Sequence, residues 1–473
     1  MTRRHGTLGR TASPVPAGAT TRREFLKLTL AGGAATLAGS AGLGCLARGA
    51  DGGAPSKAKR PNIVMLFADD VGWGDLGCFG HPTIQTPNLD RMADEGLRLT
   101  SFYSAPWCVP ARIELMTGRY MQRTNIRGTS VGGKGGIPDE EVTLAEALKG
   151  AGYRTGMMGK WHLGYAQDTF LPTGQGFDYY FGLPYSNDMT KPWVNTNVPL
   201  WLYENTKKVE NPVNQDTLTT RYTEHAVEFI RKNKEGPFFL YVAYSMAHLP
   251  IHTREDFRGK SRAGLYGDVI QTIDWSVGQV LGTLKELGLD ENTLVVFSSD
   301  NGPWLNLPDR MLQGGNKPWH QGSPGPLRGY KHTTYEGGVR EPTIARWPGR
   351  IPPGRSSAEM AALMDLYVTF VTLGGGRLPD HPVDGYDLTA FLLGETGRSP
   401  RQEYFYFRHV LEGLRVGPWK LRIPDGVELF NLEVDPSERF NRAEDKPEIV
   451  ERLRKRMEDM AKEVGSKVAE KSK

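Results

Sequence analysis

Short apolar runs, each followed closely by polar residues, recur along the chain after residue 60. Four of these runs have the length of strands and occupy residues 62–68, 153–158, 238–245 and 293–298. Residues rich in Asp, Asn, His or Lys come shortly after each run. Because apolar residues fill consecutive positions instead of alternate ones, the pattern predicts strands that are buried on both faces of a sheet.

Segments with helical periodicity lie between the runs, and each ends beside a glycine. They predict helices over residues 87–95, 144–149 and roughly 266–287, since glycine is common just after the last turn of a helix. Strands that alternate with helices are typical of a mostly parallel α/β sheet. Sites in such sheets form beyond the carboxyl ends of the strands, so we expect the polar residues after the four runs to meet at one edge.

The pattern changes after about residue 395. Residues 402–408 and 414–423 predict short strands joined by turns, and residues 446–464 predict a charged amphipathic helix. We therefore interpret residues 61–394 as the main domain and residues 395–473 as a smaller α+β domain, with an antiparallel sheet and a terminal helix.

The first 46 residues have the features of an export signal. Arg22 and Arg23 precede Phe-Leu-Lys, and a Gly/Ala-rich apolar run extends from Leu28 to Leu46. The run is too short and too weakly apolar for a membrane span. Twin arginines before such a run are typical of a Tat signal, which predicts an exported, periplasmic or extracellular protein with no transmembrane span.

The segment after this signal, residues 47–60, is rich in Gly, Ala and Lys and is interpreted as a linker. Cys45 leaves a lipid anchor open as an alternative. Gly42, however, stands where a lipoprotein signal has an aliphatic residue.

Charge and cysteine content limit the classes of function and the sources of stability that the chain can have. Residues 1–60 hold ten Lys or Arg and two acidic residues, so their net charge is +8. Because the whole chain has a net charge of +4, the remaining residues have a net charge of −4. A basic surface for nucleic acid is therefore not supported, and positive charge that handles an anionic substrate must be local. The three cysteines are Cys45, Cys78 and Cys108. Because no disulfide pair remains if Cys45 leaves with the signal and Cys108 is modified, stability rests on the core.

The pentapeptide Cys-Val-Pro-Ala-Arg at residues 108–112 is the first candidate for chemistry. Pro110 predicts the first residue of a helix that ends near Gly118. Cys108 then lies just before the helix N-terminus, where the helix dipole favours negative charge, and Arg112 can reach back toward it. This setting suits an activated nucleophile, although a buried cysteine before an ordinary helix fits the pentapeptide as well.

Oxygen donors follow two of the predicted strands: Asp69, Asp70, Asp300 and Asn301. Such hard ligands suit Ca²⁺ or Mg²⁺ better than zinc, which prefers His or Cys. A second group at the same predicted edge is cationic or titratable: Lys160, His162, His248 and Lys331. Lysine can neutralise a sulfate or phosphate oxygen, and histidine can protonate a leaving alkoxide.

These motifs resemble the type I sulfatase family, and its arylsulfatase-like members in particular, within the alkaline phosphatase-like superfamily. The resemblance runs from about residue 61 to 348, and more loosely to the C-terminus. It is carried by Cys-x-Pro-x-Arg and by the strings DDVGWGDLGCFGHP, GKWHLG, SSDNGP and GYKHTTYEGGVREP. The resemblance implies an alkaline phosphatase-like fold and hydrolysis of sulfate esters.

The same resemblance implies roles for the site residues. It implies that a maturation enzyme oxidises Cys108 to formylglycine, whose hydrate supplies the attacking oxygen. One calcium ion, with magnesium as the second choice, is held by residue 108 together with Asp69, Asp70, Asp300 and Asn301. The implied catalytic set is Cys108, Arg112, Lys160, His162, His248 and Lys331. The implied substrate-binding set is Lys160, His248, Lys331 and Ser186, with Asn187 in place of a more usual His next to Ser186.

The expected partners are a sulfated glycan or aryl sulfate, the formylglycine-generating enzyme and the Tat machinery. One alternative is a formylglycine-dependent phosphodiester or phosphonate monoester hydrolase, and another is an inactive relative that binds sulfated glycans. A two-zinc phosphatase would need a His where Asn301 stands. Aromatic residues in Pro/Gly-rich loops are further candidates for a substrate cleft: Trp193, Trp201, Trp304, Trp319 and His320.

Overall fold

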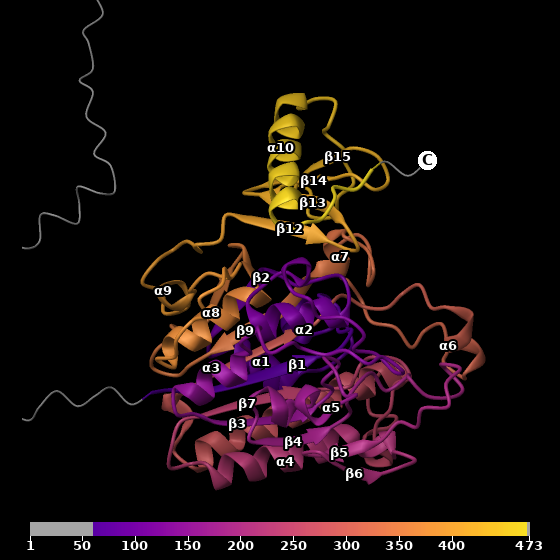
Figure 1. Ribbon diagram of the computed structural model, residues 1–473, viewed down its shortest axis with the longest axis vertical. Helices are drawn as coiled ribbons and strands as arrows, with labels where there is room; N and C mark the ends of the chain where they lie inside the picture. Colours follow the sequence, from indigo (N-terminus) through magenta and orange to yellow (C-terminus); the bar gives the residue numbers. More distant parts are fainter. Residues whose placement is uncertain (1–59, 471–473) are drawn as a thin grey trace, which may run out of the picture. The chain divides into compact units, whose positions relative to one another are not determined.

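The structure, a computed structural model, describes residues 60–470 (Figure 1). The predicted signal segment, and the predicted linker up to residue 59, lie outside these residues, so the structure does not bear on them. Within residues 60–470, no helix has both the length and the apolar character that a membrane span requires.

A sheet of eleven strands forms the centre of the described chain. Ten strands follow the order β10-β2-β9-β8-β1-β7-β3-β4-β5-β6, and β11 pairs with β2. The strands are β1 (Asn62–Ala68), β2 (Leu97–Tyr103), β3 (Arg154–Gly159), β4 (Tyr179–Gly182), β5 (Leu202–Glu204), β6 (Lys207–Glu210), β7 (Phe238–Ala243), β8 (Thr293–Ser299), β9 (Arg340–Arg346), β10 (Arg355–Ser357) and β11 (Ala361–Ala362).

The middle of this sheet is parallel, as the sequence predicts. Strands β8, β1, β7, β3 and β4 run in one direction, whereas β9 pairs antiparallel with both β8 and β2. Every residue of β1, β7 and β8 is buried, which explains their uninterrupted apolar sequences.

Helices cover both faces of the sheet (Figure 1). Ile63, Met65 and Phe67 of β1 pack in one apolar cluster with α2, α3 and α8, and the intervening Val64 and Leu66 pack in a second cluster with α1, α4 and α5. The helices are α1 (Pro87–Asp94), α2 (Cys108–Thr117), α3 (Leu144–Gly150), α4 (Leu218–Lys232), α5 (Gly264–Glu286), α6 (Asp309–Gln313), α7 (Glu336–Val339), α8 (Leu363–Leu373), α9 (Thr389–Leu392) and α10 (Pro447–Glu463).

The start of α2 differs from the prediction. The helix begins at Cys108 and not at Pro110, with Trp107 as its N-cap residue. Pro110 is the third helical residue, where its missing N–H costs no intrahelical hydrogen bond because the first four N–H groups have no intrahelical acceptor. Cys108 is therefore the first residue of the helix. The predicted end is confirmed, since Gly118 follows Thr117 with a φ of 70°.

A second sheet lies in the C-terminal part of the chain. Its strands β12 (Glu403–Phe407), β13 (Leu411–Val416), β14 (Trp419–Arg422) and β15 (Glu428–Asn431) pair antiparallel in that order. Helix α10, yellow in Figure 1, packs its apolar side on this sheet. This confirms the predicted antiparallel sheet with a helix, while the domain boundary at residue 395 stays a prediction.

Candidate functional site

Four parallel strands deliver most of the predicted site residues to one edge of the large sheet. Asp69 and Asp70 follow β1, Asp300 and Asn301 follow β8, Lys160 and His162 follow β3, and His248 follows β7. The other members of the set are Cys108 and Arg112 on α2, Ser186 in the loop after β4, and Lys331 in the loop before α7. All of these residues are buried, so burial governs their charges.

Cys108 lies among charged side chains. Its Sγ is 3.8 Å from Oδ1 of Asp69 and 3.6 Å from Nζ of Lys331. Burial raises the pKa of the Cys108 thiol to about 12, although Lys160 and Lys331 act in the opposite direction. The thiol is therefore protonated near neutral pH and is a poor nucleophile in this form.

Arg112 connects the ends of β1 and β8. One terminal nitrogen donates to Oδ2 of Asp69 at 2.8 Å and to Oδ2 of Asp300 at 2.9 Å. Lys160 forms a second ion pair with Asp69. Burial acts to raise the pKa of Asp69, but Lys160 and Arg112 outweigh it and hold this pKa below its usual value, so Asp69 is ionised.

Asp70 and Asp300 differ from Asp69, because their pKa values are raised. Nζ of Lys331 donates to both carboxylate oxygens of Asp70, at 2.7 and 2.9 Å. Burial, together with the charge of Asp69, nevertheless raises the pKa of Asp70 to about 7. Burial and the charge of Asp69 likewise raise the pKa of Asp300. The protein therefore brings together more carboxylates than its own cations keep fully ionised.

The donor atoms at this edge fit a hard divalent cation. Asp69, Asp70, Cys108 and His248 offer ligand atoms that all lie within 4.8 Å of one another. Nδ2 of Asn301 donates to Oδ1 of Asp70 at 2.7 Å, whereas its buried Oδ1 has no hydrogen-bond partner among residues 60–470. Carboxylate and amide oxygens are ligands that calcium and magnesium prefer, and a cation would also keep the acidic residues ionised.

His248 faces the same group of residues in its neutral form. Burial and the charge of Lys331 hold the pKa of His248 well below its usual value. Its Nδ1 is 2.7 Å from the carbonyl oxygen of Leu249, which can only accept, so the proton is on Nδ1 and Nε2 is an acceptor. Nε2 is 3.9 Å from Oδ2 of Asp70, and Oγ of Ser186 lies 3.3 Å from Nδ1.

His162 contacts a serine that the sequence analysis did not name. Its Nε2 is 3.4 Å from Oγ of Ser130, and its buried Nδ1 has no hydrogen-bond partner in the described part of the chain. Burial, Lys160 and Arg112 hold the pKa of His162 well below its usual value. His162 is therefore a neutral side chain with one free ring nitrogen.

Two site residues have backbone conformations that are rare outside glycine. Asp70 and His162 have φ values of 58° and 63°. A left-handed conformation costs a non-glycine residue roughly 1–3 kcal/mol and persists only where the surroundings enforce it. Here the backbone N–H of Asp70 donates to Oδ1 of Asp300, which helps to fix the turn after β1.

The structure shows contacts of the site residues that the sequence analysis did not predict. Trp304 is 8% exposed, its ring centre lies 5.3 Å from that of His248, and Nζ of Lys331 lies 4.8 Å from the ring centre. Ser130 contacts His162, and Tyr241 contacts Arg112. Trp304 had a signal, since it follows SSDNGP, whereas Ser130 is in an unremarkable Gly-rich loop and Tyr241 is in a buried strand.

The other aromatic candidates lie in different surroundings. Trp193 lines a pocket with Thr190 and Lys191, and Trp201 packs against an apolar cluster of the core. Trp319 is 73% exposed. Trp193 packs in the same apolar cluster as Trp304, but no hydrogen bond or ring contact among residues 60–470 joins these three tryptophans or His320 to Cys108, Asp69 or Lys331.

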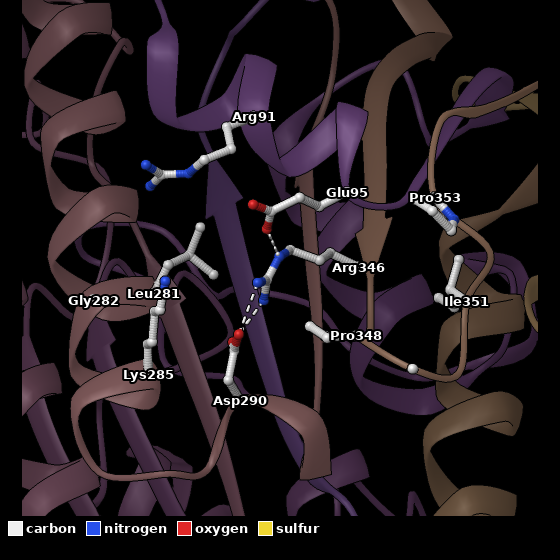
Figure 2. Close-up of a pocket in the computed structure, with 11 residues that line it drawn as sticks. Arg91, Glu95, Leu281, Gly282, Lys285, Asp290, Arg346, Pro348, Ile351 and Pro353 are labelled. Atoms are coloured by element: carbon white, nitrogen blue, oxygen red, sulfur yellow. Dashed lines mark hydrogen bonds and ion pairs between the residues drawn. The ribbon is translucent and has the colours of Figure 1, made fainter.

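A larger cavity, of about 510 Å³, lies away from the predicted site. Figure 2 shows Arg346 between Glu95 and Asp290 in this cavity, with which it forms ion pairs. Asp290 precedes β8, whereas Asp300 follows it, so the cavity is at the opposite end of this strand from the site. Its central cation is neutralised by two acids, and we assign it no chemistry.

Comparison with known proteins gives a consistent family. A family model described as Sulfatase matches residues 61–376. A second, described as N-sulphoglucosamine sulphohydrolase, C-terminal, matches residues 329–463. N-acetylgalactosamine-6-sulfatase of Canis lupus familiaris is 42% identical over an alignment of 392 residues, and the alignment covers 78% of this chain and 72% of the relative. Arylsulfatase A of Homo sapiens is 43% identical over an alignment of 372 residues, and the alignment covers 74% of this chain and 71% of the relative.

Solved structures agree with these sequence matches. A sulfatase from Pseudoalteromonas sp. has a TM-score of 0.76 at 30% identity, over 87% of this chain and 92% of its own. The phosphonate monoester hydrolase of Agrobacterium radiobacter has a TM-score of 0.61 at 20% identity, over 86% of this chain and 96% of its own. This second likeness shows a shared fold.

Proposed function

The chain belongs to the sulfatase family, and we propose that it removes sulfate from a sulfated carbohydrate or aryl sulfate with a formylglycine nucleophile and a calcium ion. The observation that carries this proposal is the position of Cys108. Its Sγ lies between Asp69 and Lys331, inside a buried group of acids and cations at the carboxyl edge of the sheet.

Two groups complete the proposed site. A calcium ion held by residue 108, Asp69, Asp70, Asp300 and Asn301 would polarise a sulfate oxygen and favour an ionised nucleophile. Formylglycine at position 108 would supply a hydroxyl nucleophile in place of a thiol that burial keeps protonated.

The charge balance of the site supports a metal. Arg112 pairs with Asp69 and Asp300, Lys160 pairs with Asp69, and Lys331 pairs with Asp70. Because every one of these cations is already paired with a carboxylate, they offer little net positive charge to an anionic substrate. A divalent cation on the carboxylates would leave this charge available to sulfate oxygens.

The residues of the chain then have separate tasks. Lys331 and Lys160 neutralise charge on the sulfate oxygens, and Arg112 holds the two carboxylates on which the site is built. His248 presents Nε2 beside the site, and the negative charge of a bound sulfate raises the pKa of this imidazole, so that it can protonate the leaving oxygen. Ser186 and the carbonyl of Leu249 orient the His248 ring.

The substrate class and location are further parts of the proposal. The names of the relatives motivate a sulfated hexosamine, with the sulfate at the 6-position, as the natural type of substrate and aryl sulfates as surrogates. The N-terminal residues motivate export through the Tat machinery, after a formylglycine-generating enzyme has acted on Cys108.

Paired esters of one phenol test the proposed reaction. We expect kcat/KM for 4-nitrophenyl sulfate to exceed that for 4-nitrophenyl phosphate by at least about 10-fold, a difference of roughly 1.4 kcal/mol in transition-state stabilisation. The protein should be produced together with a formylglycine-generating enzyme, and mass spectrometry should find an aldehyde at position 108. Preference for the phosphate ester, or for a phosphonate monoester, would favour the alternative hydrolase instead.

A further inference from the structure

A pocket of about 400 Å³ lies next to Lys331, between the loop that carries this lysine and the second sheet. The loop contributes Arg328, His332 and Tyr335, β13 contributes Glu412, and the turn between β12 and β13 contributes Arg408. Since His332 directly follows Lys331 in the chain, the pocket begins one residue away from the proposed sulfate site.

Aromatic rings connect this pocket with the site. The ring centre of Trp107, the residue before Cys108, lies 6.2 Å from that of His332 and 5.4 Å from that of His409. The ring centre of Trp304, which contacts Lys331, lies 6.5 Å from that of His332. His332 and His409 are exposed, so these two imidazole rings lie where solvent and substrate can reach them.

Arg408 has hydrogen-bonding capacity to spare. Its Nε donates to Oε1 of Glu412 at 2.7 Å, and its side chain is 42% exposed. Among residues 60–470, no hydrogen-bond acceptor contacts its two terminal nitrogens. Glu412 is held in turn by Thr334, whose hydroxyl donates to Oε2 at 2.8 Å. The guanidinium is therefore fixed at one nitrogen and free at the other two.

The other arginines of the pocket differ from Arg408. Arg422 is 5% exposed and pairs with Asp425 at 2.6 Å and Glu428 at 2.9 Å, so its charge is neutralised. Arg328 is 43% exposed, lies 3.9 Å from the ring centre of Tyr335 and is 3.4 Å from Glu428. Arg408 is thus the main anion-binding candidate, with Arg328 beside it.

The electrostatic setting favours an anion at this place. Although His332 is exposed on one side, desolvation by its neighbours and the charges of Lys331 and Arg408 lower its pKa to about 4. His332 is therefore neutral and adds an uncharged donor to the pocket. The lining also holds Glu412 and Asp425, each of which is paired with an arginine of the same pocket.

We propose that this pocket binds a second anionic group of a glycan substrate, a carboxylate or sulfate on the sugar next to the one that loses its sulfate. A planar guanidinium with two free nitrogens matches either group with paired hydrogen bonds. The inference rests on the proposed sulfatase reaction. It implies that a polyanionic oligosaccharide is a better substrate than an aryl sulfate or an isolated sulfated sugar.

Matched ligands test the pocket. The probe is a disaccharide of N-acetylgalactosamine 6-sulfate linked to a hexuronic acid, compared with the same disaccharide whose carboxylate is reduced to an alcohol. A third version carries a sulfate in place of the carboxylate, which distinguishes the two kinds of anion. We expect the wild-type protein to favour an anionic disaccharide over the reduced one by about 10-fold in kcat/KM, mainly through KM, as expected for one charge-assisted pair.

Substitutions then assign this preference to the pocket. Arg408→Gln should abolish the preference and leave turnover of the reduced disaccharide and of 4-nitrophenyl sulfate within about two-fold of wild type. Arg408→Lys should keep part of the preference, and Arg328→Gln should reduce it less. Arg377→Gln, which removes an exposed ion pair outside this pocket, is the matched control and should change nothing.

Two results would overturn the proposal. One is an equal loss of kcat/KM for the anionic and the reduced disaccharide in Arg408→Gln, because that would mean that Arg408 has a purely structural role through Glu412 and Thr334. The other is an unchanged preference in Arg408→Gln. Binding of the same ligands, measured by calorimetry, distinguishes a failure of the pocket proposal from a failure of the proposed sulfatase reaction. Absence of hydrolysis of every sulfate ester contradicts the sulfatase reaction, whereas binding that does not depend on Arg408 contradicts the pocket.

Discussion

The thiol of Cys108 is close to Lys160 and Lys331, which favour a negative charge, yet burial outweighs them and keeps it protonated. A second described cysteine, Cys78, is only partly buried and lies outside the site. We expect Cys108→Ala to lower kcat by at least about 1,000-fold, because it removes the proposed nucleophile. Cys78→Ala should leave kcat within about two-fold of wild type.

Both cysteine variants need a stability control. Circular dichroism melting should show wild-type-like transitions, since each change removes one small side chain and no ion pair. Near-wild-type turnover of Cys108→Ala on 4-nitrophenyl sulfate would refute the nucleophile assignment. Loss of turnover in both variants would point to damage elsewhere in the fold.

The unpartnered oxygen of Asn301 gives a second prediction at this scale. If Oδ1 is a ligand of the proposed cation, calcium should raise the melting temperature of the wild-type protein after treatment with a chelator. Saturation at 100 times Kd stabilises by about 2.7 kcal/mol. Asn301→Leu should lose most of this calcium-dependent shift, which is measured by differential scanning calorimetry without any substrate. An equal shift in wild type and variant would exclude Asn301 as a ligand.

Sequence patterns located the charged residues of the site but not their pairings. Asp69, Lys160 and Asp300 are visible because each follows an apolar run. That Arg112 contacts both Asp69 and Asp300 depends on the distance between β1 and β8, which no local pattern contains. Ser130 was missed for the same reason, since its loop is brought to His162 only by tertiary packing.

At the scale of elements, the second sheet holds the segment that follows Lys331. Lys420 of β14 is fully buried and pairs with Glu336 of α7 at 2.9 Å and with Glu438 at 2.8 Å. Burial acts to raise the pKa of Glu336, but Lys420, Arg340 and Arg415 outweigh it and lower this pKa to about 2. Glu336 is therefore a buried carboxylate that depends on its cations.

Removing the central cation of this cluster should be costly. We expect Lys420→Met to lower the free energy of unfolding by about 3–5 kcal/mol at pH 7, because it leaves buried charge uncompensated. Lys232→Met, which breaks an exposed pair on α4, should change it by no more than about 0.5 kcal/mol. Urea unfolding of both variants measures these changes in the free energy of unfolding. Equally small changes in the two variants would show that the cluster does not need Lys420.

Elements differed in how well the sequence predicted them. Strands β1, β7 and β8 were predicted because both of their faces are buried against apolar helices. Strand β9 was not, since its sequence REPTIAR reads as polar. Its residues are nevertheless all buried, and Arg346 at its end is balanced by Glu95 and Asp290. Ion pairing across the structure, rather than local apolarity, makes β9 possible.

On the scale of the whole molecule, the two sheets share one buried cluster. Tyr103 of β2 stacks on Tyr404 of β12 with ring centres 5.0 Å apart, and Arg415 donates to the hydroxyl of Tyr103. We expect a chain that ends at residue 394 to aggregate or to melt without cooperativity, because it exposes this cluster and removes Lys420 and Arg415 from beside the buried carboxylate of Glu336. A chain that ends at residue 470 is the control. A soluble, cooperatively folded 60–394 fragment would contradict this dependence.

The burial of Cys108 has a consequence for the timing of synthesis. Cys108 is only 5% exposed, and Lys331, which contacts its sulfur, follows 223 residues later in the chain. At a synthesis rate of about 5–20 residues per second, this gap lasts roughly 10–45 s. If Cys108 is converted to formylglycine as proposed, the converting enzyme therefore has its best access within this interval, after the segment is made and before its late partners are made. Faster translation of residues 109–331 should leave a larger fraction of unconverted thiol.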